Sequence, residues 1–408
     1  MKSIKIAVFV AKIDPTRTNP WLTDELCEAF ENNENSIDVI FIDWNNAFQP
    51  GVVINNKNTR IHIISPAGAA LGKGIVSKVL KWGFSSYYVY RYFKKHFENK
   101  SHDLLISFSP AVIFAFPILL LPSHFRFRLF VLWDFFPYHQ NQIGLIPFKW
   151  MASLGVYIET KLLSKFNYIG CMTEKNVKYL INHYKLASTV KTGVIPLWAK
   201  IRPQPIINRQ QLRAKYQLPS DMTVAVFGGQ IAAGRGIEDI VAMAKMARDE
   251  SHLVHFLVIG TGPKLAWLKS EAAHLKEFIS VLPQVPRDQY VELIASCDIG
   301  LVMTVPNVDV PSFPSKTLDY CCVGIPILAA VEHSTDYGQI INSSEFGEYC
   351  EAGNPAGFYR LIHKLSLDIS KRKKMGSNAR KYYEINFDVK KIVLKISEMV
   401  NQAHVSTD

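Results

Sequence analysis

Several patterns that would identify common protein classes are missing from this sequence. Its six cysteines form no Cys-x-x-Cys pair, so neither a zinc module nor a disulfide framework is indicated, and we expect reduced thiols in a cytoplasmic protein. The longest apolar stretch, residues 110–122, is interrupted by Pro117 and is shorter than the roughly 18 residues that span a bilayer. We expect a buried helix there. Zinc-finger spacings and aromatic RNA-binding motifs are missing as well, so no nucleic-acid partner is expected.

The length and the charge of the chain limit the number of domains and the kinds of partner that are expected. The chain has 408 residues, of which 48% are hydrophobic, which is too long for one ordinary core and fits two domains. Its net charge of +11 favours anionic partners such as phosphorylated ligands or an acidic membrane surface. The first 14 residues contain a short apolar run that alternates as a strand does and lacks a small-residue cleavage site, so we expect no signal peptide.

Short strand-like runs alternate with helical patterns along the chain, with a Pro-containing linker at residues 194–210. This alternation is typical of βα units and parallel sheets. It predicts an α/β protein with two Rossmann-like domains that face each other across a cleft. The expected strands are residues 5–11, 37–43, 103–109, 127–134 and 167–173 in the first half, and 223–230, 254–262, 279–285, 298–305 and 325–331 in the second.

The first strand of the second half is followed by a glycine-rich turn. It ends at Gly229 and Gln230, and Arg235 stands between two further glycines before a helical pattern begins. Ligands of open parallel sheets bind beyond the carboxyl ends of the strands. Glycines there let a ligand approach the backbone, a helix N-terminus offers N–H groups to an anion, and the arginine fork suits phosphate. Taken alone, the turn fits a ligand loop and a simple tight turn equally well.

A second pattern, "SFPSKTLDYCCVGIPILA", predicts a short helix over residues 315–323. Ser312 or Ser315 can cap it, and the following glycine suits a left-handed stop. Lys316 and Asp319 then share one face near its N-terminus. Lys316 would lie beside a phosphate, and Asp319 would accept hydrogen bonds from the two ribose hydroxyls. The alternative is a surface ion pair worth less than about 1 kcal/mol, which the apolar "CCVG" segment behind it argues against.

With these pieces in order, the chain resembles the glycosyltransferases of family 4, which have the GT-B fold. The resemblance is carried by "LRAKYQLPSDMTVAVFGGQIAAGRGIEDIVAMAKMA", "LVIGTGP", "VLPQVPRDQYVELIASCDIGLVM" and "PSKTLDYCCVGIPILA". It implies a nucleotide-sugar domain at residues 199–379, an acceptor domain at residues 1–198, and a C-terminal segment at residues 380–408 that returns to the acceptor domain. The donor-binding residues that it implies are Gly229, Gln230, Arg235, Gly262, Val285, Ser312, Lys316 and Asp319.

The sequence departs from the family at the expected sugar contacts. The family commonly has two glutamates separated by seven residues, and Asp319 matches the second of them. Pro311 stands at the first position, with Asp309 as a loose substitute. Gln230 stands where the family has its first arginine. A Pro-Ser-Lys start is familiar in the bacterial polysaccharide members of the family, in which Lys316 would replace that arginine at the diphosphate.

The first half supplies the acceptor candidates. "WDFFPYHQNQIGLIP" follows an expected strand and resembles the Asp-x-x-Pro turn of polysaccharide transferases in the family. It makes Asp134 the candidate that positions or deprotonates the acceptor hydroxyl, with His139 as the second choice. Asp14 follows the first strand and either contacts the acceptor or caps the next helix.

The resemblance implies a retaining glycosyltransferase. Arg235, Lys316 and helix-end N–H groups would stabilise the leaving diphosphate, with a UDP-sugar as donor and a lipid-linked or polysaccharide acceptor of bacterial surface glycan synthesis. Since no Asp-x-Asp pair occurs in the chain, we expect no metal and no other cofactor. Two alternatives stay open: a UDP-sugar epimerase of the same fold, and a non-catalytic membrane-associated protein that binds nucleotide sugars. A dehydrogenase is disfavoured because the first strand has no Gly-x-Gly-x-x-Gly after it.

A basic and aromatic segment bears on where in the cell the protein acts. Residues 72–97 contain six basic residues and eight aromatic residues but no acidic residue. Such a segment suits the surface of an anionic membrane, and it predicts a peripheral protein on the inner face of the cytoplasmic membrane. The alternative is an ordinary helix whose aromatic rings pack on the sheet and whose lysines face water.

Overall fold

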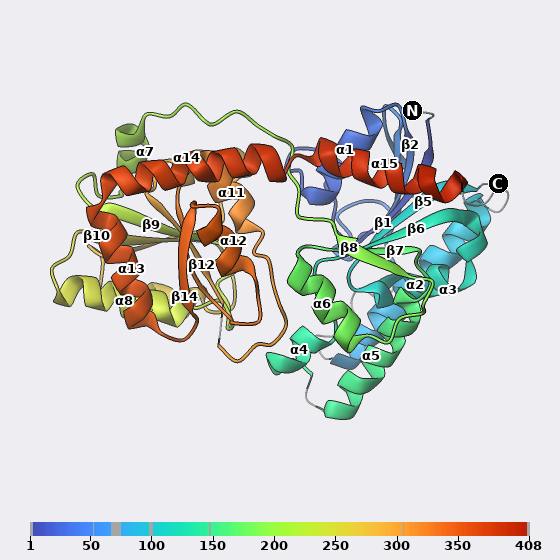
Figure 1. Cartoon of the computed structure of the whole chain (residues 1–408), viewed down its shortest axis with the longest axis horizontal. Helices are drawn as coiled ribbons and strands as arrows, with labels where there is room; N and C mark the ends of the chain where they lie inside the picture. Colours follow the sequence, from blue (N-terminus) through green and yellow to red (C-terminus); the bar gives the residue numbers. More distant parts are fainter. Residues whose placement is uncertain are drawn as a thin grey trace. The chain divides into compact units, whose positions relative to one another are not determined.

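The computed structural model describes residues 3–51, 53–66, 75–97, 101–146, 148–304 and 306–405. The chain divides into two compact units (Figure 1). The first unit consists of Met1–Lys200 and Val389–Asp408, and the second unit consists of Ile201–Asp388. Each unit is built around a sheet whose strands are mainly parallel and are connected by helices.

Within its described residues, the first unit has a sheet with the strand order β3-β4-β2-β1-β5-β6-β7-β8. All neighbouring strands pair in parallel except β3, which is antiparallel to β4. The order reverses between β1 and β5, which pair in parallel with Ile6 opposite Leu104. The strands are β1 (Lys5–Val10), β2 (Ser36–Ile42), β3 (Val53–Asn56), β4 (Thr59–Ile64), β5 (His102–Phe108), β6 (Phe125–Leu132), β7 (Tyr168–Cys171) and β8 (Lys191–Val194).

The core of the first unit depends on aromatic packing between its sheet and its helices. The ring of Phe9 on β1 lies 5.7 Å from that of Phe93 and 5.4 Å from that of Phe114. The central strands are buried on both faces, which is why they contain nearly continuous apolar runs. The helices are α1 (Leu22–Glu31), α2 (Ile75–Phe97), the 3-10 helix η1 (Ala111–Phe114), α3 (Ala115–Leu120), the 3-10 helix η2 (Pro122–His124), α4 (Tyr138–Gln142), α5 (Lys149–Leu163), α6 (Glu174–His183) and α15 (Val389–Val405).

The chain returns to the first unit through its last helix, α15, which packs against α1 (Figure 1). The backbone N–H of Val389 donates to Ala199, 3.0 Å away. The return begins nine residues later than the expected residue 380, because the whole of α14 (Ile369–Asn386) belongs to the second unit. Arg380 on α14 donates to the carbonyls of Cys322 and Arg202 at 2.7 and 2.6 Å and thereby anchors this helix.

Within its described residues, the second unit has a fully parallel sheet with the order β11-β10-β9-β12-β13-β14. Numbered from the start of the unit, this order is 3-2-1-4-5-6, which is typical of dinucleotide-binding folds, and it reverses between β9 and β12. The strands are β9 (Thr223–Gly228), β10 (Val254–Ile259), β11 (Ile279–Leu282), β12 (Ile299–Met303), β13 (Ile327–Val331) and β14 (Gly347–Glu351).

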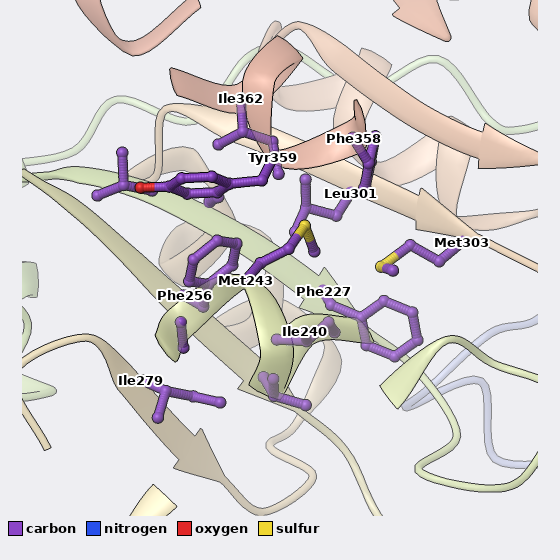
Figure 2. Close-up of a cluster of buried hydrophobic side chains, with 14 of the residues drawn as sticks. Phe227, Ile240, Met243, Phe256, Ile279, Leu301, Met303, Phe358, Tyr359 and Ile362 are labelled. Atoms are coloured by element: carbon purple, nitrogen blue, oxygen red, sulfur yellow. The ribbon is translucent and has the colours of Figure 1, made fainter. Parts of the chain in front are cut away.

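The core of the second unit lies where α8 and α13 pack on this sheet. Figure 2 shows Met243 of α8 between side chains of the sheet, such as Phe256, and of α13, such as Tyr359, all of them buried. The helices of this unit are α7 (Arg209–Lys215), α8 (Ile237–Asp249), α9 (Leu265–Ala272), α10 (Arg287–Ala295), α11 (Lys316–Val323), α12 (Tyr337–Ser343), α13 (Pro355–Leu367) and α14 (Ile369–Asn386).

All ten strands that the sequence predicted are present, most of them shorter at the carboxyl end. One element differs from its prediction. Residues 110–122 form η1 and α3 rather than one buried helix, and in α3 only Pro117 and Ile118 are buried. Phe116, Leu119 and Leu120 are exposed by 40%, 44% and 54%, so the expectation of a buried helix is wrong for half of α3.

Asp298, just before β12, is expected to be important for stability. Its carboxylate accepts from Arg209, from Arg213 at 2.6 Å and from the backbone N–H of Val224 at 2.8 Å. The Arg213 side chain is only 4% exposed, so Asp298→Ala leaves a buried cation without its carboxylate. We expect a loss of about 3–5 kcal/mol in the free energy of unfolding, measured by urea denaturation.

The matched control for this change is Asp249→Ala. Asp249 pairs with Arg248 at 2.8 Å, but its side chain is 62% exposed. Exposed pairs of this kind contribute about 0–1 kcal/mol. Equal losses in the two variants would show that the Asp298 pair is no more important than a surface contact.

Candidate functional site

The point where the strand order of the second unit reverses, between β9 and β12, is where open α/β sheets bind ligands. The loop after β9 contains Gly229, Gln230 and Arg235 and leads into α8. The segment after β12 contains Ser312 and leads into α11. The structure therefore places the two donor motifs that the sequence predicted on the two strands that flank this point.

Two glycines, Gly229 and Gly262, lie at the carboxyl ends of β9 and β10. Gly229 has φ +143° and donates its N–H to Ile259 at 2.9 Å. Gly262, after β10, has φ +155°, and a Cβ there would overlap the carbonyl oxygen of Ile231. Both positions therefore require glycine, because of the backbone conformation and, at Gly262, also because of the close contact. Gln230 follows directly and is exposed.

Lys316 lies close to Gly229 and to the ring of Phe227. It is the first residue of α11, and its ammonium group is 3.5 Å from the centroid of the Phe227 ring on β9. A Cβ built on Gly229 would be 3.8 Å from Lys316 Nζ. Burial, and secondly the positive charge of Arg235, lower the pKa of Lys316 to about 7. The structure therefore brings Lys316 beside Gly229, and the positive charge of Arg235, in the loop after β9, disfavours the charged ammonium unless an anion binds there.

Asp319 lies one turn further along α11 and forms an ion pair with Arg287. Arg287 begins α10, two residues after Val285, which is half-buried. The sequence analysis missed Arg287, because the pair joins two helices and no local pattern indicates it. The carboxylate of Asp319 therefore already accepts a hydrogen bond from one guanidinium group. A ligand hydroxyl would donate a further hydrogen bond to the same carboxylate.

Tyr320 fixes the orientation of α11. Its buried hydroxyl accepts from the N–H of Gly228 at 3.1 Å and donates to the carbonyl of Val226 at 3.0 Å, both on β9. A Cβ at Gly300 would overlap the Tyr320 ring, so β12 also packs closely on this helix. Because Tyr320 packs against the sheet, Lys316 and Asp319 lie on the partly exposed face of α11. The sequence indicated only that the following segment, "CCVG", is apolar.

The capping predicted for α11 is wrong. The Ser315 side chain makes no capping hydrogen bond, and the first-turn N–H groups of Thr317 and Leu318 donate to the carbonyls of Pro314 and Ser315. This helix end thus offers an anion fewer N–H groups than the sequence suggested.

Ser312, the other predicted cap, instead holds the segment that precedes α11. Its hydroxyl donates to Glu332 at 2.7 Å, and Thr304 donates to the other carboxylate oxygen of Glu332 at 2.6 Å. Glu332 is buried and was missed by sequence reasoning. In the same segment Pro311 is buried and Asp309 is exposed, so Asp309 keeps access to a ligand.

In the first unit, the acceptor candidates follow β1 and β6, the two strands that flank β5 in the sheet. Asp134 is exposed after β6, and its backbone N–H donates to Ser109 Oγ at 3.0 Å. Ser109 follows β5 and also accepts from the N–H of Trp133, so this hydroxyl fixes the turn that presents Asp134. His139 lies on α4 and is half-buried.

Asp14 organises the loop after β1 rather than a helix end. Its carboxylate accepts from Thr16 Oγ1 at 2.6 Å, from Asn19 N at 2.5 Å and from Thr18 Oγ1 at 3.2 Å. Partial burial acts to raise its pKa, but these hydrogen bonds outweigh it and lower the pKa below its usual value. Of the two alternatives for Asp14, the cap of α1 is wrong, since Asp24 accepts from the N–H of Trp21, the N-cap residue, at 2.8 Å, and contact with the acceptor stays a prediction.

The basic and aromatic segment forms α2, with Lys73 and the side chain of Lys78 outside the described residues. Phe93 and Phe97 are buried in the core, whereas Phe84, Tyr87 and Tyr88 are exposed by 49%, 41% and 42%. Packing of aromatic rings in the core therefore accounts for part of the helix, and docking to a membrane stays a prediction. In the part of the chain that the structure describes, none of the helices combines the length and the apolarity needed to cross a membrane.

Metal ligands are a separate question. Among the described residues, no three His, Cys, Asp or Glu side chains gather in a way that could hold a metal ion. Independence from metal stays a prediction, because a metal ion can also be held by a substrate diphosphate.

Comparison with known proteins connects this geometry to a family. Residues 208–382 match the family model of glycosyl transferases group 1. The chain is 27% identical over 172 residues to the probable glycosyltransferase WbjE of Pseudomonas aeruginosa, covering 41% of this chain and 40% of that protein. It is 25% identical over 223 residues to D-inositol 3-phosphate glycosyltransferase of Streptomyces bingchenggensis, covering 52% and 48%. The chain thus spans about half the length of these curated relatives.

Solved structures resemble almost the whole chain. Sucrose-phosphate synthase of Thermosynechococcus elongatus has a TM-score of 0.78 at 15% identity, covering 99% of this chain and 100% of that one. WaaG, a glycosyltransferase involved in lipopolysaccharide biosynthesis, has a TM-score of 0.65 at 13% identity, covering 97% and 99%. HepE of Anabaena in complex with UDP and glucose has a TM-score of 0.68 at 14% identity, covering 98% and 100%. At these identities the likeness concerns the fold, and the GT-B fold that the sequence predicted is confirmed.

Proposed function

Because residues 208–382 match the family model of glycosyl transferases group 1, we propose that the protein transfers a sugar from a nucleoside-diphosphate sugar to an acceptor hydroxyl, with retention at the anomeric carbon. The observation that carries the proposal is the position of Lys316 and Arg235. Lys316 lies next to Gly229, at the carboxyl end of β9, where the strand order reverses, and Arg235 follows in the same loop, near enough to lower the pKa of Lys316. A diphosphate is the group that this arrangement suits best.

In the proposed reaction the bond between the anomeric carbon and the phosphate oxygen breaks, and its electron pair stays with the diphosphate. The ammonium of Lys316 and the guanidinium of Arg235 stabilise that developing charge. The acceptor oxygen then forms its bond on the same face of the sugar. Its proton passes to a phosphate oxygen or to Asp134, which follows β6 and is exposed. Asp319 holds the ribose hydroxyls, with Arg287 beside it.

The identity of the donor is part of the proposal. The HepE structure contains UDP and glucose, and a trehalose-6-phosphate structure from E. coli, with a TM-score of 0.72 to this chain, contains UDP-2-fluoro glucose. These neighbours favour UDP as the nucleotide. The resemblance to family 4, in which Asp319 stands at the second glutamate position, agrees with this choice.

For the acceptor, we propose a lipid-linked glycan or polysaccharide of the bacterial surface, met at the inner face of the cytoplasmic membrane. The relative WaaG is described as acting in lipopolysaccharide biosynthesis. In this chain, α2 presents Arg91, Lys94 and Lys95 as exposed cations and contains no acidic residue. Each basic residue near an anionic surface contributes about 1 kcal/mol to binding, so α2 can draw the protein to such a membrane.

The test uses a panel of nucleotide sugars labelled in the sugar, incubated with the protein and a lipid extract of the source cells. The proposal predicts that the label moves into the lipid or glycan fraction. An epimerase would instead leave the label on the nucleotide in a changed sugar, with no need for an acceptor. A binding protein would leave every donor unchanged, and either result would overturn the proposal.

Removal of metal ions provides a separate prediction. Since Lys316 and Arg235 supply positive charge for the diphosphate, activity should persist at half or more of its original rate after dialysis against EDTA. The measurement compares initial rates with and without added Mg²⁺ or Mn²⁺. A strict requirement for either ion would contradict the metal-free account.

A further inference from the structure

The helix α5 presents an apolar stripe to solvent. Trp150, Leu154, Tyr157 and Ile158 follow one another at the spacing that places side chains on one helix face. Their exposed fractions are 65%, 50%, 60% and 38%. Leu145 and Phe148, which immediately precede the helix, are exposed by 58% and 57%. We call these six residues the α5 stripe.

The opposite face of α5 is the one that packs on the protein. Glu159 on that face is buried and accepts from the N–H groups of Ala111 and Val112 at 2.6 and 3.1 Å. At Gly155 the helix meets Pro137 so closely that a Cβ would lie 2.9 Å from its ring. Because these contacts fix the rotation of the helix, the stripe cannot turn inward, and an apolar face of this size is unusual on a monomeric soluble protein.

Neighbouring helices add exposed apolar side chains. α3 packs on α5 and on α2, and the rings of Tyr87 on α2 and Phe116 on α3 lie 5.8 Å apart. Both are exposed by about 40%. The three helices lie in the same part of the first unit (Figure 1), so α2 and α3 add exposed apolar side chains to the part of the unit that contains the stripe.

The charges around the stripe are basic. Lys149, Lys161 and Lys165 are exposed, and Lys161 Nζ lies 5.5 Å from the centroid of the Tyr157 ring. Within residues 148–165 the only acidic residue is Glu159, which is buried. A second copy that docked through the same face would bring these lysines against their equivalents. An anionic lipid surface would instead meet them with opposite charge.

We propose that the α5 stripe inserts into the interfacial layer of an anionic lipid membrane. Trp150 and Tyr157 combine an apolar ring with a polar group and suit the headgroup boundary. Leu154 and Ile158 reach below it, and the lysines contact the phosphates. The inference deepens the proposed function. It rests on that function in one respect only, since a lipid-linked acceptor would be the reason for the protein to bind a membrane. It assigns apolar insertion to α5, whereas the cations of α2 provide attraction alone.

The test is sedimentation with vesicles of phosphatidylcholine containing one quarter phosphatidylglycerol. Relative to wild type, the triple variant Trp150→Ser, Leu154→Ser and Tyr157→Ser should partition at least tenfold more weakly. The matched control is Ile206→Ser, Leu367→Ser and Ile385→Ser, at side chains of the second unit that are exposed by 103%, 74% and 59%. This control should partition as the wild type does. Equal partitioning of the stripe variant and wild type would overturn the proposal.

A second readout separates insertion from loss of folding. With brominated lipids in the vesicles, the fluorescence of the wild type should be quenched on binding. Trp150→Leu keeps an apolar side chain, so it should bind nearly as well but lose a large part of this quenching. Quenching that is unchanged in Trp150→Leu would overturn the insertion of this residue. A wild-type dimer in sedimentation velocity that the stripe variant dissociates, with no vesicle binding, would assign the stripe to a second copy instead.

The result can be separated from failure of the proposed function. Release of nucleoside diphosphate from the donor with a water-soluble acceptor analogue does not involve the stripe, so the stripe variant should retain it. If nucleoside diphosphate is still released but the wild type does not bind vesicles, only the inference about the α5 stripe is wrong. If wild type binds vesicles but never consumes a donor, the proposed function alone is wrong.

Discussion

Replacing Lys316 with alanine is expected to lower kcat/KM for sugar transfer by about 100-fold or more. Its ammonium lies over Phe227 and beside Gly229, where the leaving diphosphate would gain charge. The folded protein should not lose stability, because burial and Arg235 already disfavour the charged ammonium. The measurement is steady-state kinetics with a thermal melt, and Lys245→Ala, at a half-exposed lysine on α8, is the control. A kcat/KM within about twofold of wild type would remove Lys316 from the site.

The same residue should determine the alkaline limb of the pH profile. With a pKa of about 7, Lys316 is protonated below pH 7 and loses its proton as the pH rises through that value. Since the protonated form is the one that stabilises the diphosphate, kcat/KM should fall about tenfold for each pH unit above 7. The Lys316→Ala variant should lack this limb. A wild-type profile that is flat to pH 9 would contradict the assignment.

Asp319→Asn is expected to have the second largest effect, a loss of nucleoside-diphosphate affinity of about tenfold or more, because charge-assisted hydrogen bonds to ribose are removed. The specific readout is discrimination between UDP and 2′-deoxy-UDP. Wild type should favour the ribose form, and Asp319→Asn should bind both alike. Persistence of the full preference in this variant would show that Asp319 does not contact the ribose.

Arg287 should act through Asp319, with which it pairs. In a double-mutant cycle, Arg287→Ala should weaken UDP binding by less than Asp319→Asn does. Adding it to Asp319→Asn should change little further, since residues that act as a unit are not additive. Additive losses would instead indicate that Arg287 contacts the nucleotide independently.

The sequence predicted the parts of this fold that depend on local patterns. The central strands of both sheets are apolar on both faces and were found. β3, β4, β8 and β14 were not predicted. β3, β8 and β14 are short and partly exposed, whereas β4 is largely buried but has Arg60 and His62 within its apolar run. The turn chemistry at Gly229 and the stop at Gly324, which has φ +72°, also follow from local rules.

What sequence reasoning missed at the site are contacts between distant elements. The pair of Arg287 with Asp319 joins α10 to α11, and Glu332 reaches Ser312 across 20 residues. The face that a helix turns to solvent also depends on tertiary packing. For this reason the basic segment of α2 was noticed in the sequence, whereas the α5 stripe became evident only from exposure.

The central claim is that the carboxyl end of β9 in the second unit binds the diphosphate of a nucleotide. Calorimetric titration of UDP, GDP and ADP into wild type and Lys316→Ala tests it most directly. The account predicts that UDP binds wild type with one site per chain, and that Lys316→Ala binds it at least tenfold more weakly while remaining folded. Binding of none of the three to wild type, or equally tight binding of UDP to both proteins, would contradict the account.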